Sequence, residues 1–309
     1  MRLYRDVETQ INVKTNFQKR AIIRKSGAGR YAPSPTGPLH LGNLRTAILA
    51  WRDAREAGAD FILRIEDIDI PRTVPGSESG ILRDLSMIGI EWDEGPDLGG
   101  PADPYRQSER EAIYRDALMF LAQKQMVYPC TCSRKDLKDL SSAPHGPDGP
   151  VYPGTCAGFE STGSEWLEQI LNSRAPETSI RFRVPRIRNF HFHDNILGPQ
   201  ICDMITGCGD FVVRRRDGLW AYQFACAVDD GLMGITRVVR GADLLTSTPK
   251  QITLLNALEL PVPAYMHVPL VRDQTGNRLS KRDGAQSLEE MLATYSLEDI
   301  INHLTSLSD

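Results

Sequence analysis

The sequence predicts an α/β protein in which a Rossmann-like parallel sheet is split by an α+β insertion and followed by a short helical C-terminus. Three observations carry this prediction. Strand and helix patterns alternate over the first third of the chain, which is typical of a parallel sheet with crossover helices. A cysteine-containing stretch rich in Ser, Pro and Gly interrupts this pattern between about residues 126 and 200. The alternation then resumes.

The first elements are set by turns and apolar spacing. Residues 30–32 indicate the end of a strand, because the three prolines that follow forbid helix or sheet pairing. Helical spacing of apolar residues predicts a helix over 39–57, which Gly58 ends. A buried strand at 61–65 and a helix at 77–88 come next.

The later elements follow the same rules. A capping-box pattern at Ser108–Glu111 predicts a helix that runs to about residue 125. Residues 180–184 alternate like a strand, and 219–228 and 235–239 are also predicted as strands. Pro249 in a favourable first turn supports a helix over 248–258.

Length and these patterns divide the chain. At roughly 150 residues per domain, 309 residues predict about two domains. We predict the two halves of a nucleotide-binding domain at 30–125 and 201–272, the insertion at 126–200, and a basic loop with short helices at 273–309. Residues 1–29 contain seven Lys or Arg against two acids, and we expect a poorly ordered extension there. A targeting arm or a phosphate contact is the alternative.

The composition excludes several function classes. Hydrophobic residues make up 41% and charged residues 25%, which argues against a mostly disordered chain. The net charge is −4, so a nucleic acid can be bound only by a local basic patch. No apolar run approaches the ~20 residues of a membrane span, and no signal-peptide core opens the chain. We therefore expect a cytoplasmic protein without membrane contact, and a monomer.

Two separate loops have the residues of a phosphate site. In the first, residues 33–38 form a tight loop, and His40 and Gly42 follow at the start of a helix. Free N–H groups there suit phosphate, Gly42 allows close approach, and His40 can donate to phosphate oxygens. A turn with a helix-capping His is the alternative. In the second, the basic residues 278–282 can close over a polyphosphate, and solvated surface is the alternative.

Together the two loops resemble the signature motifs of class I aminoacyl-tRNA synthetases. Four further stretches are similar to glutamyl-tRNA synthetases: 30–37, 63–69, 105–110 and 238–243. The chain ends where the anticodon-binding region of that family would begin. We therefore expect a member of the family's short branch, an enzyme that activates L-glutamate with ATP without tRNA and attaches it to the queuosine base of tRNA(Asp).

The resemblance implies the residues of the active site. His40 and Lys281 would be catalytic, because they stabilise the charge of the transferring phosphate. ATP, with Mg²⁺, would contact Pro35, Thr36, Gly37, His40, Gly42, Asn43, Ser280 and Lys281. The family's second loop usually begins with Lys and ends with Ser, whereas this chain has Arg278 and Arg282. We expect this difference to affect the rate of activation and not its occurrence.

Glutamate selection requires partners for one ammonium group and two carboxylates. Glu66 can bind the ammonium, Arg30 and Arg240 can pair with carboxylates, and Tyr222 supplies a directional hydroxyl. The resemblance implies that glutamate contacts Arg30, Ala32, Ser34, Glu66, Tyr222 and Arg240. The alternatives are an ion pair between Glu66 and Arg64 and a core position for Tyr222.

A metal site is indicated by part of the cysteines. Cys130, Cys132, Tyr152 and Cys156 offer three thiolates and a phenolate, enough for a closed four-coordinate site. The spacing alone fits buried apolar cysteines as well. The arrangement is similar to the zinc site of the short branch, which implies one structural Zn²⁺ per chain. The remaining cysteines are expected in the core: Cys202, Cys208 and Cys226.

Two other polar runs receive ordinary interpretations. His191 and His193 point to one face of a predicted strand, and we expect an exposed strand face within the insertion. Arg214–Arg216 precede Asp217 and Gly218, a pattern typical of a solvated hairpin turn. Contacts to tRNA phosphates are the alternative for these arginines.

Two other functions stay open on the sequence. One is a truncated glutamyl-tRNA synthetase that acylates the 3′ end of tRNA(Glu). The other is a catalytically silent tRNA-binding module. The presence of His40, Glu66, Arg240 and Lys281 together argues against the silent module.

Overall fold

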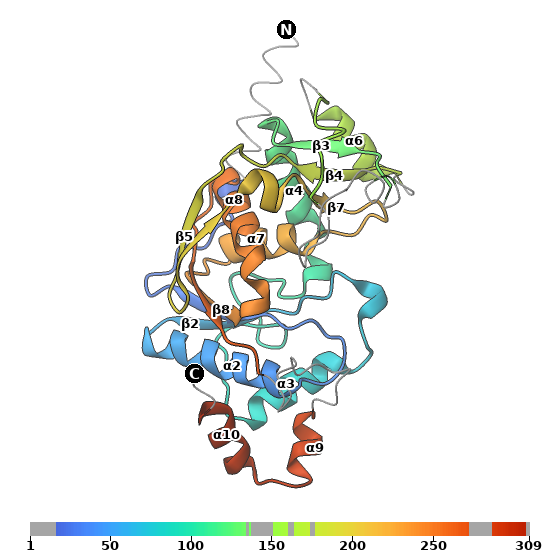
Figure 1. Ribbon diagram of the computed structural model, residues 1–309. Coiled ribbons are helices and arrows are strands. Elements are labelled where there is room, and N and C mark those ends of the chain that lie inside the picture. Colours follow the sequence, from blue (N-terminus) through green and yellow to red (C-terminus); the bar gives the residue numbers. More distant parts are fainter. Residues whose placement is uncertain are drawn as a thin grey trace.

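The computed structural model describes residues 17–133, 136, 151–159, 164–173, 177–271 and 286–306. A six-stranded sheet with the order β2-β1-β8-β9-β5-β6 forms its centre (Figure 1). Every pairing in it is parallel except the β5–β6 hairpin, so the predicted parallel sheet is confirmed. Its strands are β1 (Ala28–Tyr31), β2 (Asp60–Leu63), β5 (Phe190–Asp194), β6 (Gly198–Cys202), β8 (Arg237–Gly241) and β9 (Ala264–Val268).

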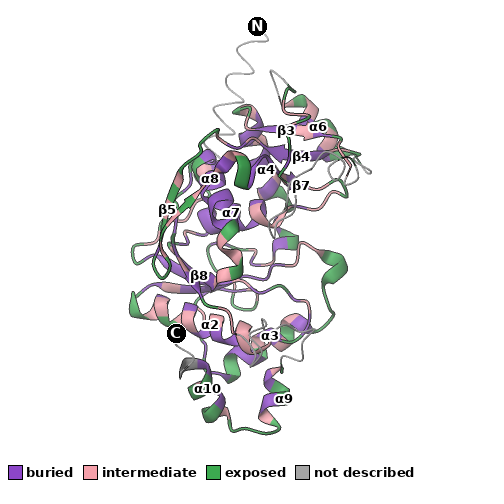
Figure 2. Cartoon of the chain, viewed as in Figure 1, coloured by how far each residue is buried: buried purple, intermediate pink, exposed green. Residues whose placement is uncertain are grey.

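Helices cover both faces of this sheet (Figure 1). On one face Leu44 and Ile48 of α2 pack against Leu63 and Val239 of the sheet. On the other face lie α7 and α8, and the sides that they turn inward are buried (Figure 2). The helices are α2 (Leu41–Glu56), α3 (Ser77–Met87), α4 (Glu111–Gln123), α6 (Glu165–Asn172), α7 (Tyr222–Leu232), α8 (Thr248–Ala257), α9 (Leu288–Leu292) and α10 (Leu297–Ser306).

A second, three-stranded antiparallel sheet forms the insertion, at the top of Figure 1. It has the order β3-β4-β7, with β3 (Val127–Cys130), β4 (Ser179–Phe182) and β7 (Phe211–Arg214). One hydrophobic cluster runs from α7 and α8 through α4 to this sheet, so the insertion shares a core with the central domain. Four short helical segments complete the description: η1 (Ile70–Arg72), η2 (Gln107–Glu109), η3 (Met204–Cys208, a π-helix) and η4 (Ala242–Ser247).

The structure corrects the predicted limits of the insertion, 126–200. The hairpin β5–β6 belongs to the central sheet, because Asp194 pairs with Tyr265 of β9. Strand β7, placed in the second half of the nucleotide-binding domain by the sequence, pairs with β4 of the small sheet. Strand periodicity tells which residues share a face but not which sheet the strand joins, and this explains the error.

The N-terminal extension predicted as poorly ordered is ordered from residue 17 on. Phe17 is 1% exposed and packs against the ring of Phe120. Arg24 donates to Asp60 and Glu94 at 2.8 Å each, and it thereby ties the segment to the loop after β2. Residues 1–16 lie outside the described part of the chain.

Two local predictions were also wrong. Residues 219–228, predicted as a strand, contain the start of α7; a short apolar run does not distinguish a buried helix from a buried strand. The Ser108 hydroxyl bonds Asp67 instead of capping a helix, and α4 begins at Glu111. No helix in the described part of the chain is long and apolar enough to cross a membrane.

Candidate active site

A cavity of about 500 Å³ opens at the carboxyl ends of β1, β8 and β9. In sheets of this kind, ligands bind at that edge. Most of the predicted site residues line it: Arg30, Ala32, Ser34, Thr36, Gly37, His40, Gly42, Asn43, Glu66, Tyr222 and Arg240. Pro35 lines an adjoining cavity of about 340 Å³, which shares Ser34, Thr36, Glu66 and Tyr222 with the first. Ser280 and Lys281, with Arg278 and Arg282, lie outside the described residues.

The loop after β1 presents the N-terminus of α2 to this cavity. His40 is the N-cap residue, and its Nδ1 accepts a hydrogen bond of 3.3 Å from the Asn43 amide. The helix-capping alternative is therefore real, and it places the proton of the neutral ring on Nε2, the atom that can donate to a phosphate oxygen. A Cβ on Gly42 would lie 3.2 Å from the His40 ring, so the glycine makes room for the cap.

Gly37 and Ser77 hold the loop in place. Gly37 has φ of +118°, a conformation that side chains disfavour. Its amide donates to the Ser77 hydroxyl at 3.0 Å, and that hydroxyl donates back to the Gly37 carbonyl at 2.9 Å. This exchange ties the loop to the first residue of α3.

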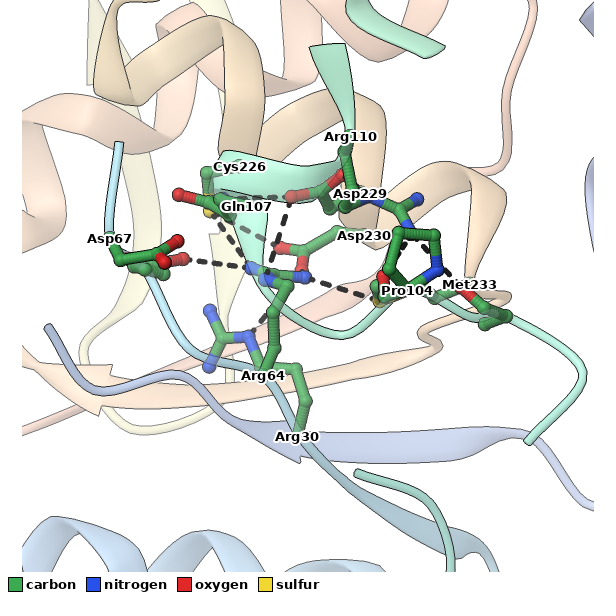
Figure 3. A network of polar contacts seen from close by, with 12 residues as sticks. Arg30, Arg64, Asp67, Pro104, Gln107, Arg110, Cys226, Asp229, Asp230 and Met233 are labelled. Atoms are coloured by element: carbon green, nitrogen blue, oxygen red, sulfur yellow. Dashed lines mark hydrogen bonds and ion pairs between the residues drawn. The ribbon is translucent and has the colours of Figure 1, made fainter. Parts of the chain in front are cut away.

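Glu66 reaches the cavity from the segment after β2. Its Oε1 accepts from Arg64 Nη2 at 2.9 Å, so the ion pair considered on the sequence exists and still leaves Glu66 in the cavity wall. Burial raises the pKa of Glu66, and Arg64 and Arg30 act against that rise. Arg64 is fully buried and also donates to Asp230 at 2.7 Å (Figure 3).

Behind this wall lies a network of buried charges that the sequence reasoning missed. Asp230 also pairs with Arg30, whose Nε lies 3.5 Å from its Oδ1. The neighbouring Asp229 accepts from Arg110 at 2.7 Å and from Gln107 at 2.7 Å (Figure 3). Two adjacent acids in the apolar run of α7 were a signal for this network, since unpaired acids are not buried.

Arg240 closes the opposite side of the cavity. It is 3% exposed, and its guanidinium donates to Gln251 Oε1 at 2.6 Å and to Thr248 Oγ1 at 2.8 Å. Tyr222 begins α7 and lines both cavities. Burial raises the pKa of Tyr222 above its ordinary value, so its hydroxyl stays protonated and can donate.

The predicted metal ligands also come together. The Sγ atoms of Cys130, Cys132 and Cys156 lie within 4.8 Å of one another. Tyr152 Oη is 3.5 Å from Cys130 Sγ and 3.8 Å from Cys132 Sγ. These separations fit a tetrahedron with metal–sulfur bonds of about 2.3 Å, whose sulfurs lie roughly 3.8 Å apart.

Arg181, a residue that the sequence reasoning did not assign to the cluster, supports it from β4. Its Nε donates to Cys130 Sγ at 3.2 Å, and its guanidinium carbon lies 3.7 Å from the centre of the Tyr152 ring. Burial acts to raise the pKa of Cys130, but the hydrogen bonds from Tyr152 and Arg181 outweigh it and lower the pKa to about 7. The site therefore favours a thiolate, the form that binds metal.

The other polar runs have the roles expected on the sequence or nearby ones. His191 and His193 are exposed on one face of β5, although this strand belongs to the central sheet. Arg215 pairs with Asp217 at 2.5 Å in a turn that contains Gly218, as predicted. Cys208 and Cys226 are buried, whereas Cys202 is half-buried.

Comparison with known proteins decides the family. Residues 28–304 match the family model of tRNA synthetases class I (E and Q), catalytic domain. The chain belongs to this family. The expected membership of a class I aminoacyl-tRNA synthetase-type ligase is thereby confirmed.

The relatives within the family are consistent. The chain is 51% identical to a glutamyl-Q tRNA(Asp) synthetase of Symbiobacterium thermophilum, over 91% of this chain and 86% of the relative. It is 44% identical to a glutamate–tRNA ligase 2 of Alkalilimnicola ehrlichii, over 90% of this chain and 58% of that protein. A crystal structure of a glutamate–tRNA synthetase from Elizabethkingia anophelis is 34% identical and superposes with a TM-score of 0.71, covering 84% of this chain and 53% of that one. The class I synthetase-like α/β fold is thus shown.

Proposed function

We propose that this synthetase activates L-glutamate with ATP, without tRNA, and transfers it to the queuosine base of tRNA(Asp). The observation that carries the proposal is the composition of one cavity. A helix N-terminus with a donor histidine lies at one end, and two buried arginines and a buried glutamate form the rest of the wall. This set provides partners for a triphosphate, for two carboxylates and for an ammonium group.

The first step needs charge stabilisation and positioning. A carboxylate oxygen of glutamate attacks the α-phosphorus of ATP, and the bond to pyrophosphate breaks. We assign His40 and Lys281 to the charge that develops on the transferring phosphate. Mg²⁺, when bound with ATP, neutralises phosphate charge. Arg30, Arg240 and Glu66 hold the amino acid in line, and positioning of this kind supplies most of the rate.

The ligand contacts divide between the two ends of the cavity. Thr36, Gly37, Gly42 and Asn43 surround the N-terminus of α2 and are assigned to ATP, together with Pro35 and Ser280. Ala32, Ser34 and Tyr222 are assigned to glutamate, with the charged residues named above.

The second step passes the glutamyl group to a nucleoside hydroxyl, with release of AMP. Two findings favour queuosine of tRNA(Asp) over the 3′ end of tRNA(Glu). Identity is higher to the glutamyl-Q relative, 51% against 44%. The match also covers 86% of that relative and only 58% of the glutamate–tRNA ligase.

The experiment follows the two steps separately. Purified protein is expected to support glutamate-dependent ATP–pyrophosphate exchange in the absence of tRNA. Labelled glutamate is then expected to pass to tRNA(Asp) that contains queuosine, and not to tRNA(Asp) without it or to tRNA(Glu). A site built around the hydroxyls of the modified base leaves its own polar groups unpaired with the wrong nucleoside, a penalty of up to about 10⁴-fold in rate.

The acceptor control is a tRNA whose terminal ribose is oxidised with periodate under conditions that spare queuosine. Transfer to tRNA(Glu) that this oxidation prevents would favour the truncated glutamyl-tRNA synthetase. Absence of exchange under all conditions would favour the silent tRNA-binding module.

We further propose that Cys130, Cys132, Tyr152 and Cys156 hold one structural Zn²⁺. Four protein ligands would leave no position for water or substrate, so the ion would stabilise the insertion and take no part in the reaction. The distances among the four side chains and the depressed pKa of Cys130 support this proposal.

Metal analysis tests the zinc proposal. We expect about one zinc per chain in protein never exposed to chelator, and its loss in Cys130→Ser, with a lower melting temperature because metal binding is coupled to folding. Cys202→Ser, a half-buried cysteine outside the cluster, is the matched control and should keep its zinc. A zinc-free wild-type protein would contradict the proposal.

A further inference from the structure

A buried chain of three side chains leads from the interior to Arg240. Arg240 lies on β8 and is paired in register with His267 on β9. Its Nε donates to His267 Nε2 at 3.0 Å. On the far side, His267 Nδ1 lies 2.6 Å from Asp194 Oδ2, at the end of β5. The chain thus crosses three neighbouring strands of the central sheet, and both His267 and Asp194 are 0% exposed.

The hydrogen bonds around Asp194 fix its charge. Its carboxylate accepts from the backbone amides of Ile196 at 3.0 Å, Leu197 at 2.9 Å and His267 at 3.1 Å. Burial acts to raise the pKa of Asp194, but these amides and the His267 side chain outweigh it and lower the pKa. Asp194 is therefore a buried carboxylate whose acceptor sites are already occupied.

The charge of Asp194 fixes the tautomer of His267. Burial and the cation of Arg240 lower the pKa of His267, so the ring is neutral. Its one proton lies on Nδ1, facing the carboxylate, and Nε2 is left as an acceptor. Arg240 requires this acceptor, since a protonated Nε2 would face the Nε–H of the guanidinium.

Arg240 is thereby held by three neutral acceptors: His267, Gln251 and Thr248. Among the described residues no carboxylate forms an ion pair with it, although Arg30 and Arg64 both pair with Asp230. The nearest fixed negative charge in this chain of contacts acts only through the imidazole. Arg240 is thus oriented without being neutralised, which keeps its charge for an anionic ligand in the cavity.

We propose that Asp194 and His267 are positioning residues that orient Arg240 for a carboxylate of the amino-acid substrate. This rests on the proposed function, because Arg240 is assigned to glutamate there. The pair sets the plane of the guanidinium by holding Nε, and it leaves the second protons of Nη1 and Nη2 for the ligand. Neither residue touches the substrate.

Two substitutions of His267 separate its two hydrogen bonds. In His267→Gln the side-chain oxygen takes the place of Nε2 and can still accept from Arg240. In His267→Asn the side-chain amide takes the place of Nδ1 and can donate to Asp194, but it does not reach Arg240. Asp194→Asn is a third variant, which removes the charge that fixes the tautomer.

The matched control is Tyr265→Phe. Tyr265 lies two residues from His267 on β9, and its ring stacks on the imidazole at 12°. Its hydroxyl is buried and finds no hydrogen-bond partner among the described residues. Removing that hydroxyl changes the same stretch of the core without altering the chain of contacts to Arg240.

Glutamate-dependent ATP–pyrophosphate exchange gives the first readout. We expect the KM for glutamate to rise at least about tenfold in His267→Asn and Asp194→Asn, with the KM for ATP nearly unchanged. His267→Gln should remain within about threefold of the wild type, and Tyr265→Phe should equal it. A role in stability alone would change the melting temperature of His267→Asn and His267→Gln alike and would leave the glutamate KM of both unchanged.

The second readout does not depend on catalysis. In protein labelled at arginine, the Nε–H resonance of Arg240, assigned by its loss in Arg240→Lys, reports whether the guanidinium is held. Its hydrogen exchange should be about tenfold faster in His267→Asn than in His267→Gln or the wild type. Equal exchange rates, or an unchanged glutamate KM in folded His267→Asn and Asp194→Asn, would overturn the proposal.

A wild type without glutamate-dependent exchange would instead refute the proposed function. The resonance of Arg240 would then still decide whether Asp194 and His267 orient this side chain. Should His267→Asn fail to fold, Asp194→Asn compared with His267→Gln decides by the same two readouts.

Discussion

Arg240→Ala is expected to lower the kcat/KM of glutamate-dependent ATP–pyrophosphate exchange by about 10³-fold. Truncating one partner of a buried, hydrogen-bonded charge pair costs about 2–5 kcal/mol, and each factor of ten corresponds to about 1.4 kcal/mol. Arg240 is 3% exposed and lies in the cavity wall, so water cannot replace it. Exchange measured over a glutamate titration at saturating ATP checks this expectation.

Two variants make the result specific. Arg237→Ala removes an arginine from the same strand, but that side chain pairs with Asp53 of α2 and does not line the cavity. It should retain wild-type exchange. Arg240→Lys keeps the charge and loses the three-way hydrogen bonding, so it should retain a small part of the activity. Unimpaired exchange in folded Arg240→Ala would remove Arg240 from the glutamate pocket.

Arg64→Met should have the largest effect on stability. It leaves the carboxylates of Glu66 and Asp230 without their shared cation, in a region where both are almost fully buried. Removal of one partner from a buried ion pair costs about 3–5 kcal/mol. Urea unfolding at pH 7 measures the free energy of unfolding of the variant against the wild type.

An exposed pair provides the control for Arg64→Met. Arg20 and Asp116 pair at 2.8 Å with side chains 43% exposed, and Arg20→Met should cost no more than about 1 kcal/mol. A loss in Arg64→Met no larger than this would show that the buried network does not carry the stability assigned to it.

The pH dependence of the same variant follows from Asp230. Burial acts to raise its pKa, but Arg64 and Arg30 outweigh burial and lower it. A lowered folded pKa contributes stability that is complete above the unfolded pKa of about 3.9 and is lost as the pH falls through the folded value. Arg64→Met lacks the main cause of this shift. Its stability should therefore fall less steeply with acidification below about pH 4 than that of the wild type.

The sequence by itself determined what depends on neighbours in the chain. The phosphate loop is local: prolines, Gly37 and a histidine two residues before Gly42 can be placed only in a turn that opens a helix, and His40 caps α2 as this pattern allows. The parallel sheet followed in the same way from alternating strands and helices. The cysteine cluster also needed only short spacings, and its four side chains meet.

Only the tertiary structure decided the contacts between distant segments. Strand β5 carries an ordinary alternating pattern, and nothing in it tells that it joins β9 of the central sheet or that Asp194 meets His267, 73 residues later. Arg64 and Asp230 are likewise 166 residues apart. Periodicity reports which side chains share a face, whereas the partner of a buried charge is set by which strands and helices become neighbours when the sheet assembles. For this reason the groups that line the cavity were predictable, and the buried groups that orient them were not.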